Sequence, residues 1–428
     1  MPCSCLLYVL NCSTNRKTKI RKTENHEEEK MNKKELQEIK RQLKPENERL
    51  MLRGIQEAYG RRRDEDAAIL FTRLIDPETL STEEEELYFD IFKKSLGGTP
   101  GKNLMEYGFD HTDPQAVDLR QKLFDYRNGL LLEEEEFDKF AKEIIDKGNY
   151  RNPVYVTAGI FEYSAPNLNA NHEELEGNST FRFMIAAVSE ARLTDIGLFY
   201  SSRENSVQRK VNEEMQIIPS PLDAFLYPVF SDRAADVNHF LYHSKTAKQP
   251  NIDLIEQYFH IPFQSTAPEQ SEGFSTLIAD VFPEGLQMKT AINLHRNLSD
   301  YIKEGSEEDV VVTCDKARVR DLLEASGAPR SNMERFDEAY SRILEDQPLA
   351  AINLLEKGKI SLKSPAISIS VKDEALDDIQ TRTIDGRTCL VIAISDEVQI
   401  SHMPADIREP QKEVRVQPAD NQDESYNG

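Results

Sequence analysis

The spacing of apolar residues changes along the chain and divides it into regions with different expected structures. From residue 31 to 150, apolar residues recur every three or four positions, which is typical of helices that bury one face. Strand-like runs begin at Val154, and helical spacing returns after residue 250. The pattern predicts an α+β protein with a helical N-terminal region (31–150), a central domain with a mainly antiparallel sheet and helices (151–305), and a small C-terminal β module with a helix and a β-hairpin (306–402).

The clearest helix signal lies at Ser81-Thr-Glu-Glu-Glu85. Its first residues can cap a helix, and its acidic side chains suit the positive end of the helix dipole. Gly97-Gly98 then predicts the end of this helix. The segment Leu50–Tyr59 fits either a helix or a strand. Further helices are predicted around Leu36–Leu43, Gln115–Asn128, Phe137–Ile145, Ile252–Phe259, Phe274–Phe282 and Leu286–Lys303.

In the central domain, Val154–Phe161 and Phe181–Val188 have the composition of strands. No long helical pattern separates the apolar runs of this region, and for that reason an antiparallel sheet is favoured over a parallel one. The segment Val237–His243 fits either a strand or a helix.

The stretch Pro221–Arg233 is the most apolar and aromatic part of the chain. On an extended chain its alternate residues would be apolar on both faces, which predicts a strand buried on two sides. It ends at the charged pair Asp232-Arg233, where a buried strand would reach the surface. We interpret this pair as a structural ion pair. The alternative is a binding site in which Arg233 holds a phosphate or carboxylate.

The two ends of the chain differ from the rest in composition. Residues 1–30 combine a Cys-rich start with a basic segment, and we expect translation to start at Met31, since GAG-type codons for Glu27–Glu29 would supply a purine-rich ribosome-binding sequence; the alternative is a disordered N-terminal arm. Near the other end, Asp385-Gly386 between apolar runs predicts a β-hairpin. Residues 403–428 are dominated by polar residues and predict a disordered tail.

Charge and cysteine content limit the classes of function. A net charge of −23 argues against nonspecific attraction to nucleic acid or to an anionic membrane. Cys314 and Cys389 lie far from the three cysteines of the first dozen residues, so no disulfide framework is predicted and a reducing cytosol is favoured. No apolar run approaches the length that crosses a bilayer. We therefore expect a soluble cytoplasmic protein with neither membrane nor nucleic acid as its partner.

The loop Gly97–Asn103 invites comparison with a phosphate-binding P-loop. A P-loop has four residues between its glycines and a hydroxyl side chain after its lysine, whereas this loop has three residues and then Asn103. It also follows a helix, where a P-loop follows a strand. We interpret it as a helix end and turn; the alternative is an anion site formed by Lys102, Asn103 and nearby backbone amides.

His239 and His243, with Asp236 before them, are the weak candidates for a metal site. On a helix the three side chains would share one face, but on a strand Asp236 would not. We interpret the histidines as packed among aromatic residues and predict no cofactor. The sequence also lacks a Gly-x-Ser-x-Gly nucleophile motif and a Gly-x-Gly-x-x-Gly dinucleotide motif.

A set of short segments, in order along the chain, resembles a known family. They are Met31-Asn-Lys-Lys-Glu-Leu36, Leu43-Lys-Pro-Glu46, Gly98-Thr-Pro-Gly-Lys-Asn-Leu104, Phe225-Leu-Tyr-Pro-Val-Phe-Ser-Asp-Arg233 and Ile384-Asp-Gly-Arg387. With these segments, residues 31–400 resemble the bacterial family "domain of unknown function 4317". The family pattern begins at the equivalent of Met31, which supports a start there. The resemblance implies no activity, cofactor or site, and the positions of His239 and His243 are commonly other residues in that family.

Taken together, these patterns favour a non-enzymatic protein that binds a protein or small-molecule partner, because no known catalytic arrangement of residues is found. The alternative is an enzyme or nucleotide-binding protein with a site where the central strand ends, near Asp232 and Arg233 and with Lys102 as a further contributor. If these three side chains and His239 met in one pocket, the alternative would gain support.

Overall fold

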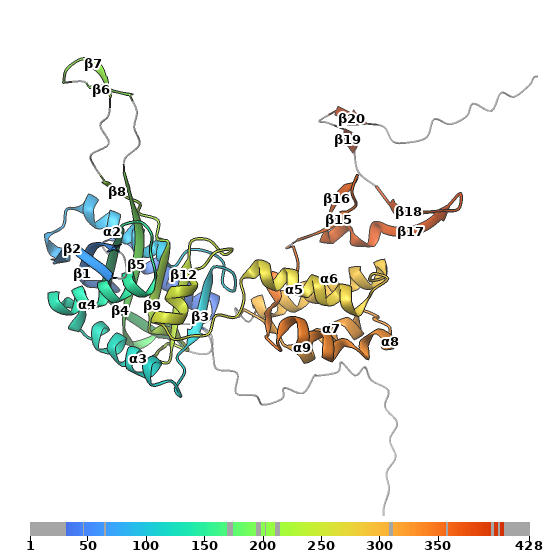
Figure 1. Cartoon of the computed structure of the whole chain (residues 1–428), viewed down its shortest axis with the longest axis horizontal. Helices are drawn as coiled ribbons and strands as arrows, with labels where there is room; N and C mark the ends of the chain where they lie inside the picture. The colour runs from blue at the N-terminus through green and yellow to red at the C-terminus, as the bar shows by residue number, and fades with distance from the viewer. Residues whose placement is uncertain are drawn as a thin grey trace, which may run out of the picture.

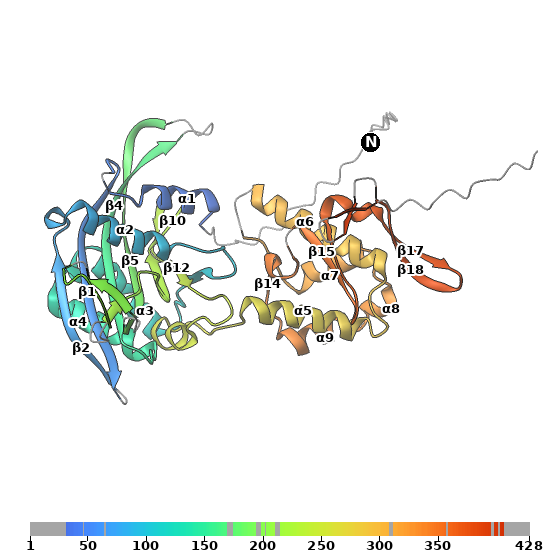
Figure 2. The same ribbon diagram turned by 90° about the horizontal axis from the view of Figure 1, so that it is seen from above.

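The computed structural model describes residues 31–45, 47–63, 66–168, 174–193, 198–201, 203–209, 215–307, 311–356, 358–394, 398–400 and 403–405. The predicted N-terminal extension (1–30) and residues 406–428 of the predicted tail lie outside the described residues. A unit built around a large sheet lies beside a unit of helices, and short β-hairpins follow the helices (Figures 1 and 2).

The main sheet is antiparallel throughout, with the strand order β2-β1-β4-β5-β9-β12-β3. Its strands are β1 (Leu50–Arg63), β2 (Asp66–Ile75), β3 (Leu104–Gly108), β4 (Val154–Leu168), β5 (Glu174–Leu193), β9 (Asp223–Tyr227) and β12 (His239–Ser244). The short strand β8 (Met215–Ile217) pairs with the end of β5. The α+β class and the antiparallel sheet predicted from the sequence are confirmed.

Three strands of this sheet lie within residues 31–150, where helical spacing dominates the sequence. The segment Leu50–Tyr59, for which helix and strand were both open, is part of β1, and β1 pairs with β4 across residue 150. The strand pattern of β2 is hidden because Ala67 and Ile69 pack into the core on one face of the sheet while Ile75 packs into the core on the other. Apolar residues therefore occupy both faces instead of alternating with polar ones.

Helices cover both faces of the sheet. One face carries α1 (Lys33–Gln42) and α2 (Thr82–Ser95), and the other carries α3 (Pro114–Arg127), α4 (Glu134–Lys147) and the π-helix η3 (Leu254–Tyr258). The predicted start of α2 is confirmed, since Ser81 and Glu84 form a reciprocal capping box. Three 3₁₀ turns, η1 (Pro77–Thr79), η2 (Leu130–Leu132) and η4 (Ala351–Asn353), join other elements.

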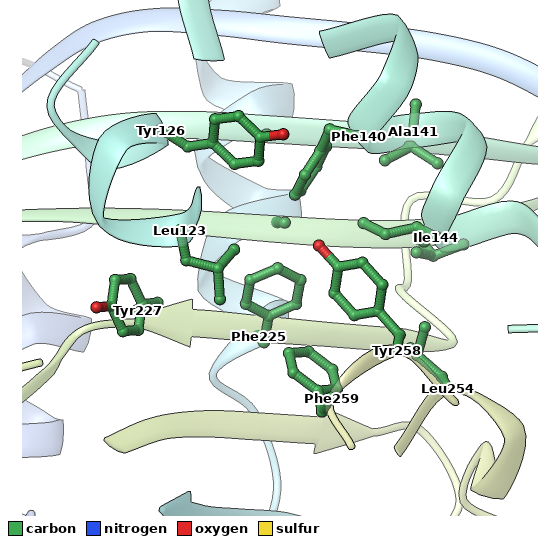
Figure 3. Packing of buried hydrophobic residues seen from close by; sticks show 14 of the residues in the cluster. Leu123, Tyr126, Phe140, Ala141, Ile144, Phe225, Tyr227, Leu254, Tyr258 and Phe259 are labelled. Atoms are coloured by element: carbon green, nitrogen blue, oxygen red, sulfur yellow. The ribbon is translucent and has the colours of Figure 1, made fainter. Parts of the chain in front are cut away.

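The predicted central strand is β9, and all five of its residues are buried. Phe225 points into the core under α3, α4 and η3, where its ring meets Phe140, Tyr258 and Phe259 (Figure 3). Leu226 points into the core on the opposite face. Full burial of one such side chain contributes about 1.5–3 kcal/mol to the free energy of unfolding. Phe225 and Leu226 therefore anchor β9 between the two helical layers.

The stretch after β9 forms a separate small hairpin instead of continuing the main sheet. Its strands are β10 (Val229–Ser231) and β11 (Ala234–Asp236), joined by a turn at Asp232 and Arg233. A second small hairpin, β6 (Leu198–Ser201) with β7 (Ser206–Arg209), lies between β5 and β8 in the chain.

The helical unit has its own apolar core. It contains α5 (Ala267–Val281), α6 (Met288–Glu307), α7 (Lys316–Ala325), α8 (Arg330–Met333) and α9 (Phe336–Leu344), with the strand pair β13 (Thr313–Cys314) and β14 (Leu349–Ala350). The sequence predicted a domain boundary between residues 305 and 306. Helix α6 continues through this position, and helices before and after it share the same core. No helix in the described part of the chain combines the length and the apolar character that a membrane span requires.

Short hairpins complete the described chain. They are β15 (Lys359–Lys363) with β16 (Ser368–Lys372), β17 (Ile379–Ile384) with β18 (Arg387–Ile392), and β19 (Val398–Ile400) with β20 (Met403–Ala405); the 3₁₀ helix η5 (Asp373–Asp378) precedes β17. The predicted hairpin at Asp385-Gly386 is confirmed, and both residues have the positive φ that its turn requires. β20 lies inside the segment predicted to be disordered.

Candidate functional site

Asp232 and Arg233 form the tip of the β10–β11 hairpin, where both have positive φ values. The Arg233 guanidinium donates to Glu38 Oε2 at 2.5 Å and to the Pro166 carbonyl at 2.6 Å. It also lies over the Phe230 ring, 5.1 Å from the centroid. This side chain therefore joins α1, β4 and β10, and its ion-pair partner is Glu38.

The backbone of the same turn contacts a second acid of α1. The Arg233 amide donates to Glu35 Oε1 at 3.4 Å. Burial raises the pKa of Glu35, although hydrogen bonds from the Asn32, Arg233 and Asp232 amides oppose the shift. The turn is thus tied to α1 by an ion pair and by backbone hydrogen bonds.

Lys102 and Asn103 lie in the loop between α2 and β3, and its amides donate within the loop. Gly101 N donates to Leu104 O at 2.9 Å, while Lys102 N and Asn103 N donate to Thr99 O at 3.0 and 3.3 Å. A P-loop needs such amides to point at a phosphate. These three are engaged by the turn instead.

The Asn103 side chain fastens this loop to the end of β12. Its Nδ2 donates to Ser244 O at 3.2 Å, and its Oδ1 accepts from Thr99 N at 2.9 Å. On the other side of the loop, Gly101 O accepts from Asn353 Nδ2 of the helical unit at 3.1 Å. The loop therefore connects the sheet unit to the helical unit.

The two candidate histidines lie at opposite ends of β12 and have different partners. His239 Nδ1 lies 2.5 Å from Asp236 Oδ2, and His243 Nδ1 lies 2.9 Å from Gly97 O. Burial lowers the pKa of His243, although its bond to Gly97 opposes the shift, so the neutral imidazole donates to that carbonyl. Within the described ranges, no three His, Cys, Asp or Glu side chains form a group that could hold a metal ion.

The structure does not bring the predicted site residues together. His239 pairs with Gly108 at one end of β3, whereas Asn103 precedes the other end of that strand and bonds Ser244. The Asp232-Arg233 turn contacts α1. These side chains therefore occupy separate positions around the sheet unit.

A cavity of about 320 Å³ lies elsewhere, at the end of the sheet where β9 begins and β12 ends. We call it the Asp223 pocket. Three chain segments form its walls: the loop between α4 and β4, the start of β9, and the segment from the end of β12 into η3. Its lining residues are Gly148, Asn149, Tyr150, Arg151, Leu222, Asp223, Ser244, Lys245, Thr246, Gln249, Asn251 and Asp253.

A buried hydrogen-bond network centred on Asp223 forms one wall of the pocket. Asp223 is only 4% exposed. Its Oδ1 accepts from the Tyr242 hydroxyl at 2.6 Å, and its Oδ2 accepts from the Tyr150 hydroxyl at 2.9 Å and from Asn251 Nδ2 at 3.4 Å. A carboxylate has about four lone-pair positions. Three donors therefore leave one acceptor position.

The ionisation of the network follows from its burial. Burial raises the pKa of Asp223, and the bonds from Tyr242, Tyr150 and Asn251 oppose that rise. Burial and the neighbouring Asp223 raise the pKa of both tyrosines, so their hydroxyls remain protonated and act as donors. Asn251 Nδ2 also donates to Gly148 O at 2.9 Å, which ties the network to the end of α4.

Two cations lie at the mouth of the pocket. The side chains of Arg151 and Lys245 are exposed, and in the described part of the chain neither has a hydrogen-bond or ion-pair partner. Lys245 acts electrostatically on Glu190. Burial by itself would raise the pKa of Glu190. The hydrogen bonds from Arg192 and Asn152 and the charges of Arg192 and Lys245 outweigh burial, so the pKa of Glu190 is lowered.

Sequence reasoning missed this pocket because its residues are distant in the chain. Tyr150 lies 73 positions before Asp223, and Asn251 lies 28 positions after it. The one local signal was an acidic residue inside the apolar stretch Pro221–Arg233. A buried carboxylate needs nearby donors, and tyrosines in neighbouring apolar runs could have been considered as those donors.

The model of the family "Domain of unknown function (DUF4317)" matches residues 31–402, which is most of the chain. Comparison with curated proteins and with solved structures gives no match.

Proposed function

Because the chain belongs to the DUF4317 family, whose description assigns no activity, we propose from the geometry that the protein is a non-enzymatic ligand-binding protein. The ligand is a small polar molecule held in the Asp223 pocket. The observation that carries this proposal is the cavity of about 320 Å³, which combines a buried carboxylate network with two exposed cations. Pockets for small molecules range from about 300 to 1,000 Å³ and carry a few well-placed polar groups.

Binding is favoured over catalysis because the reactive groups of this pocket are occupied or held in unreactive forms. Asp223 accepts three hydrogen bonds, and its two tyrosine partners are kept protonated. The described lining contains no histidine or cysteine. A nucleophile with an adjacent base, the arrangement that covalent catalysis needs, is therefore not found among these residues.

The alternative, an enzyme or nucleotide-binding protein with its site at Asp232 and Arg233, has less support. The Arg233 guanidinium already bonds Glu38 and Pro166. To bind a phosphate it would have to release α1 from the hairpin. Lys102 and His239 lie at other positions and would not reach the same ligand.

We also propose a cytoplasmic location. Cys314 and Cys389 are both free thiols, which suits a reducing compartment. Burial raises the pKa of Cys314 to about 12. That thiol therefore stays protonated and packs as a small apolar side chain.

Native mass spectrometry of the full chain, purified without denaturation from the cells that produce it, tests the binding proposal. We expect a small molecule to be retained by the unaltered protein and lost from Thr246→Trp, because the indole would fill part of the pocket. Thr383→Trp, on the exposed face of β17, is the matched control and should retain the molecule. An unaltered protein with no bound molecule, or equal retention by both variants, would refute the proposal. Conversion of the bound molecule during incubation would refute its non-enzymatic part.

A further inference from the structure

We propose that the ligand of the Asp223 pocket is an anion, and that Arg151 and Lys245 bind its phosphate or carboxylate group. This inference rests on the proposed binding function and adds the chemical class of the ligand. The other end of the ligand carries a hydrogen-bond donor, such as a hydroxyl or amino group, from which Asp223 accepts a hydrogen bond.

The first support is that these two cations lie together at a cavity, unlike the arginines of the sheet unit that are held in ion pairs. Arg53, Arg73 and Arg233 each have a carboxylate partner, Glu162, Glu57 and Glu38 respectively. Such pairing is expected of a protein with a net charge of −23, in which acids outnumber bases. Arg151 and Lys245 stand at the rim of a cavity without such a partner in the described chain. Their charges are thus available to a ligand.

The second support is that the acids of the pocket are already engaged. Asp253 accepts from Asn149 Nδ2 at 3.0 Å and from Gln257 Nε2 at 3.1 Å. Asp223 lies behind the surface and bonds three donors. Neither carboxylate forms an ion pair with Arg151 or Lys245 in the described chain, so an incoming anion does not have to displace one.

The geometry of the groups then indicates how an anion would lie. An arginine can bind both oxygens of a phosphate or carboxylate through two parallel N–H bonds, and a lysine adds a point charge. The remaining acceptor position of Asp223 suits a donor group on the ligand. Arg151 and Lys245 would repel a ligand with a cationic group at the mouth. The pocket therefore favours anionic ligands over cationic ones.

The test compares full-length variants in titrations with inorganic phosphate and with acetate, followed by isothermal calorimetry. The variant Arg151→Gln/Lys245→Gln removes both cations at the mouth. The variant Lys142→Gln/Lys248→Gln makes the same change in net charge at exposed positions outside the lining. Because the variant loses the charged hydrogen-bond donors of both side chains, we expect its binding to be at least about tenfold weaker, which corresponds to about 1.4 kcal/mol. The control should bind as the unaltered protein does.

Equal binding of both probes by the two double variants would overturn the inference. The molecule recovered by native mass spectrometry gives an independent readout. If it has no acidic group, or if Arg151→Gln/Lys245→Gln retains it fully, the anion assignment falls while the binding function stands. If the unaltered protein retains nothing and binds neither probe, both proposals fall.

Discussion

Replacing Tyr242 with phenylalanine removes one of the three donors to the buried Asp223 carboxylate. The lost hydroxyl lies 2.6 Å from Asp223 Oδ1 and also accepts from the Asn251 amide at 3.3 Å. The ring itself is retained, including its edge contact with Phe259 at a centroid distance of 6.3 Å. The change is therefore confined to hydrogen bonding. Since a hydrogen bond to a charged group contributes about 1.5–3 kcal/mol, we expect the free energy of unfolding of the sheet unit to fall by about that amount.

The loss should depend on pH in a defined direction. Burial raises the pKa of Asp223, and the Tyr242 hydroxyl opposes the rise, so the variant has a still higher pKa at this carboxyl. A carboxyl whose folded-state pKa exceeds its unfolded value favours the folded state while protonated, and this contribution is lost as pH rises through the folded-state pKa. The difference between Tyr242→Phe and the unaltered protein is therefore largest at neutral pH and shrinks as pH falls toward that raised pKa.

Hydrogen exchange measured by mass spectrometry at increasing urea concentration checks this prediction. Peptides from β9 and β12 report the sheet unit separately from the helical unit. Tyr107→Phe is the matched control, because the Tyr107 hydroxyl donates to the thioether sulfur of Met105 at 3.3 Å, a weak acceptor. A loss in Tyr242→Phe no greater than that in Tyr107→Phe, or a difference that grows in acid, would refute the reasoning.

Two further predictions concern the joint between the units and the end of β12. Gly101→Ala places a Cβ 2.8 Å from Val311 Cγ1 at a φ of +79°, and the strained backbone alone costs about 1–3 kcal/mol. We expect Gly101→Ala to speed hydrogen exchange in residues 350–354. Gly129→Ala is the control and should leave that exchange unchanged, because no atom lies within 4 Å of its added Cβ. An equal effect of both variants would contradict the contact between Gly101 and the helical unit. Burial lowers the pKa of His243, so the stability contributed by its neutral form is present above the unfolded pKa of about 6.5 and is lost as pH falls below it. His243→Gln should flatten the fall in unfolding free energy measured by urea titration between about pH 7 and 5, and an unchanged slope would contradict it.

Elements defined by nearby residues could be predicted from the sequence. The start of α2 depends on Ser81 and Glu84, three positions apart, and the β17–β18 turn depends on the adjacent Asp385 and Gly386. Strand β3 could not be predicted, because Leu104–Gly108 becomes a strand through its pairing with β12. The sequence does not reveal such a pairing, since the partner lies far along the chain.

In the candidate site, too, the features set by nearby residues could be predicted, whereas those set by distant residues could not. The sequence pointed to Asp232-Arg233 as a place where charge follows a buried stretch, but the partners of Arg233, Glu38 and Pro166, are distant in the chain. Asp223 could not be identified as a site residue from the sequence, because its setting depends on the register of β9 beside β12, which brings Tyr242 to its carboxylate. Charge and composition indicate where polar groups must be satisfied, whereas the sheet decides which groups satisfy them.

The pairing of β3 with β12 also has a consequence during synthesis on the ribosome. β3 leaves the exit tunnel roughly 135 residues before its hydrogen-bonding neighbour, which is a delay of roughly 7–27 s at about 5–20 residues per second. Until then Leu104, buried in the finished protein, has no strand beside it to cover it. We expect the nascent chain to stay open along this edge until residue 244 has emerged, and the helices beyond residue 267 to fold after that.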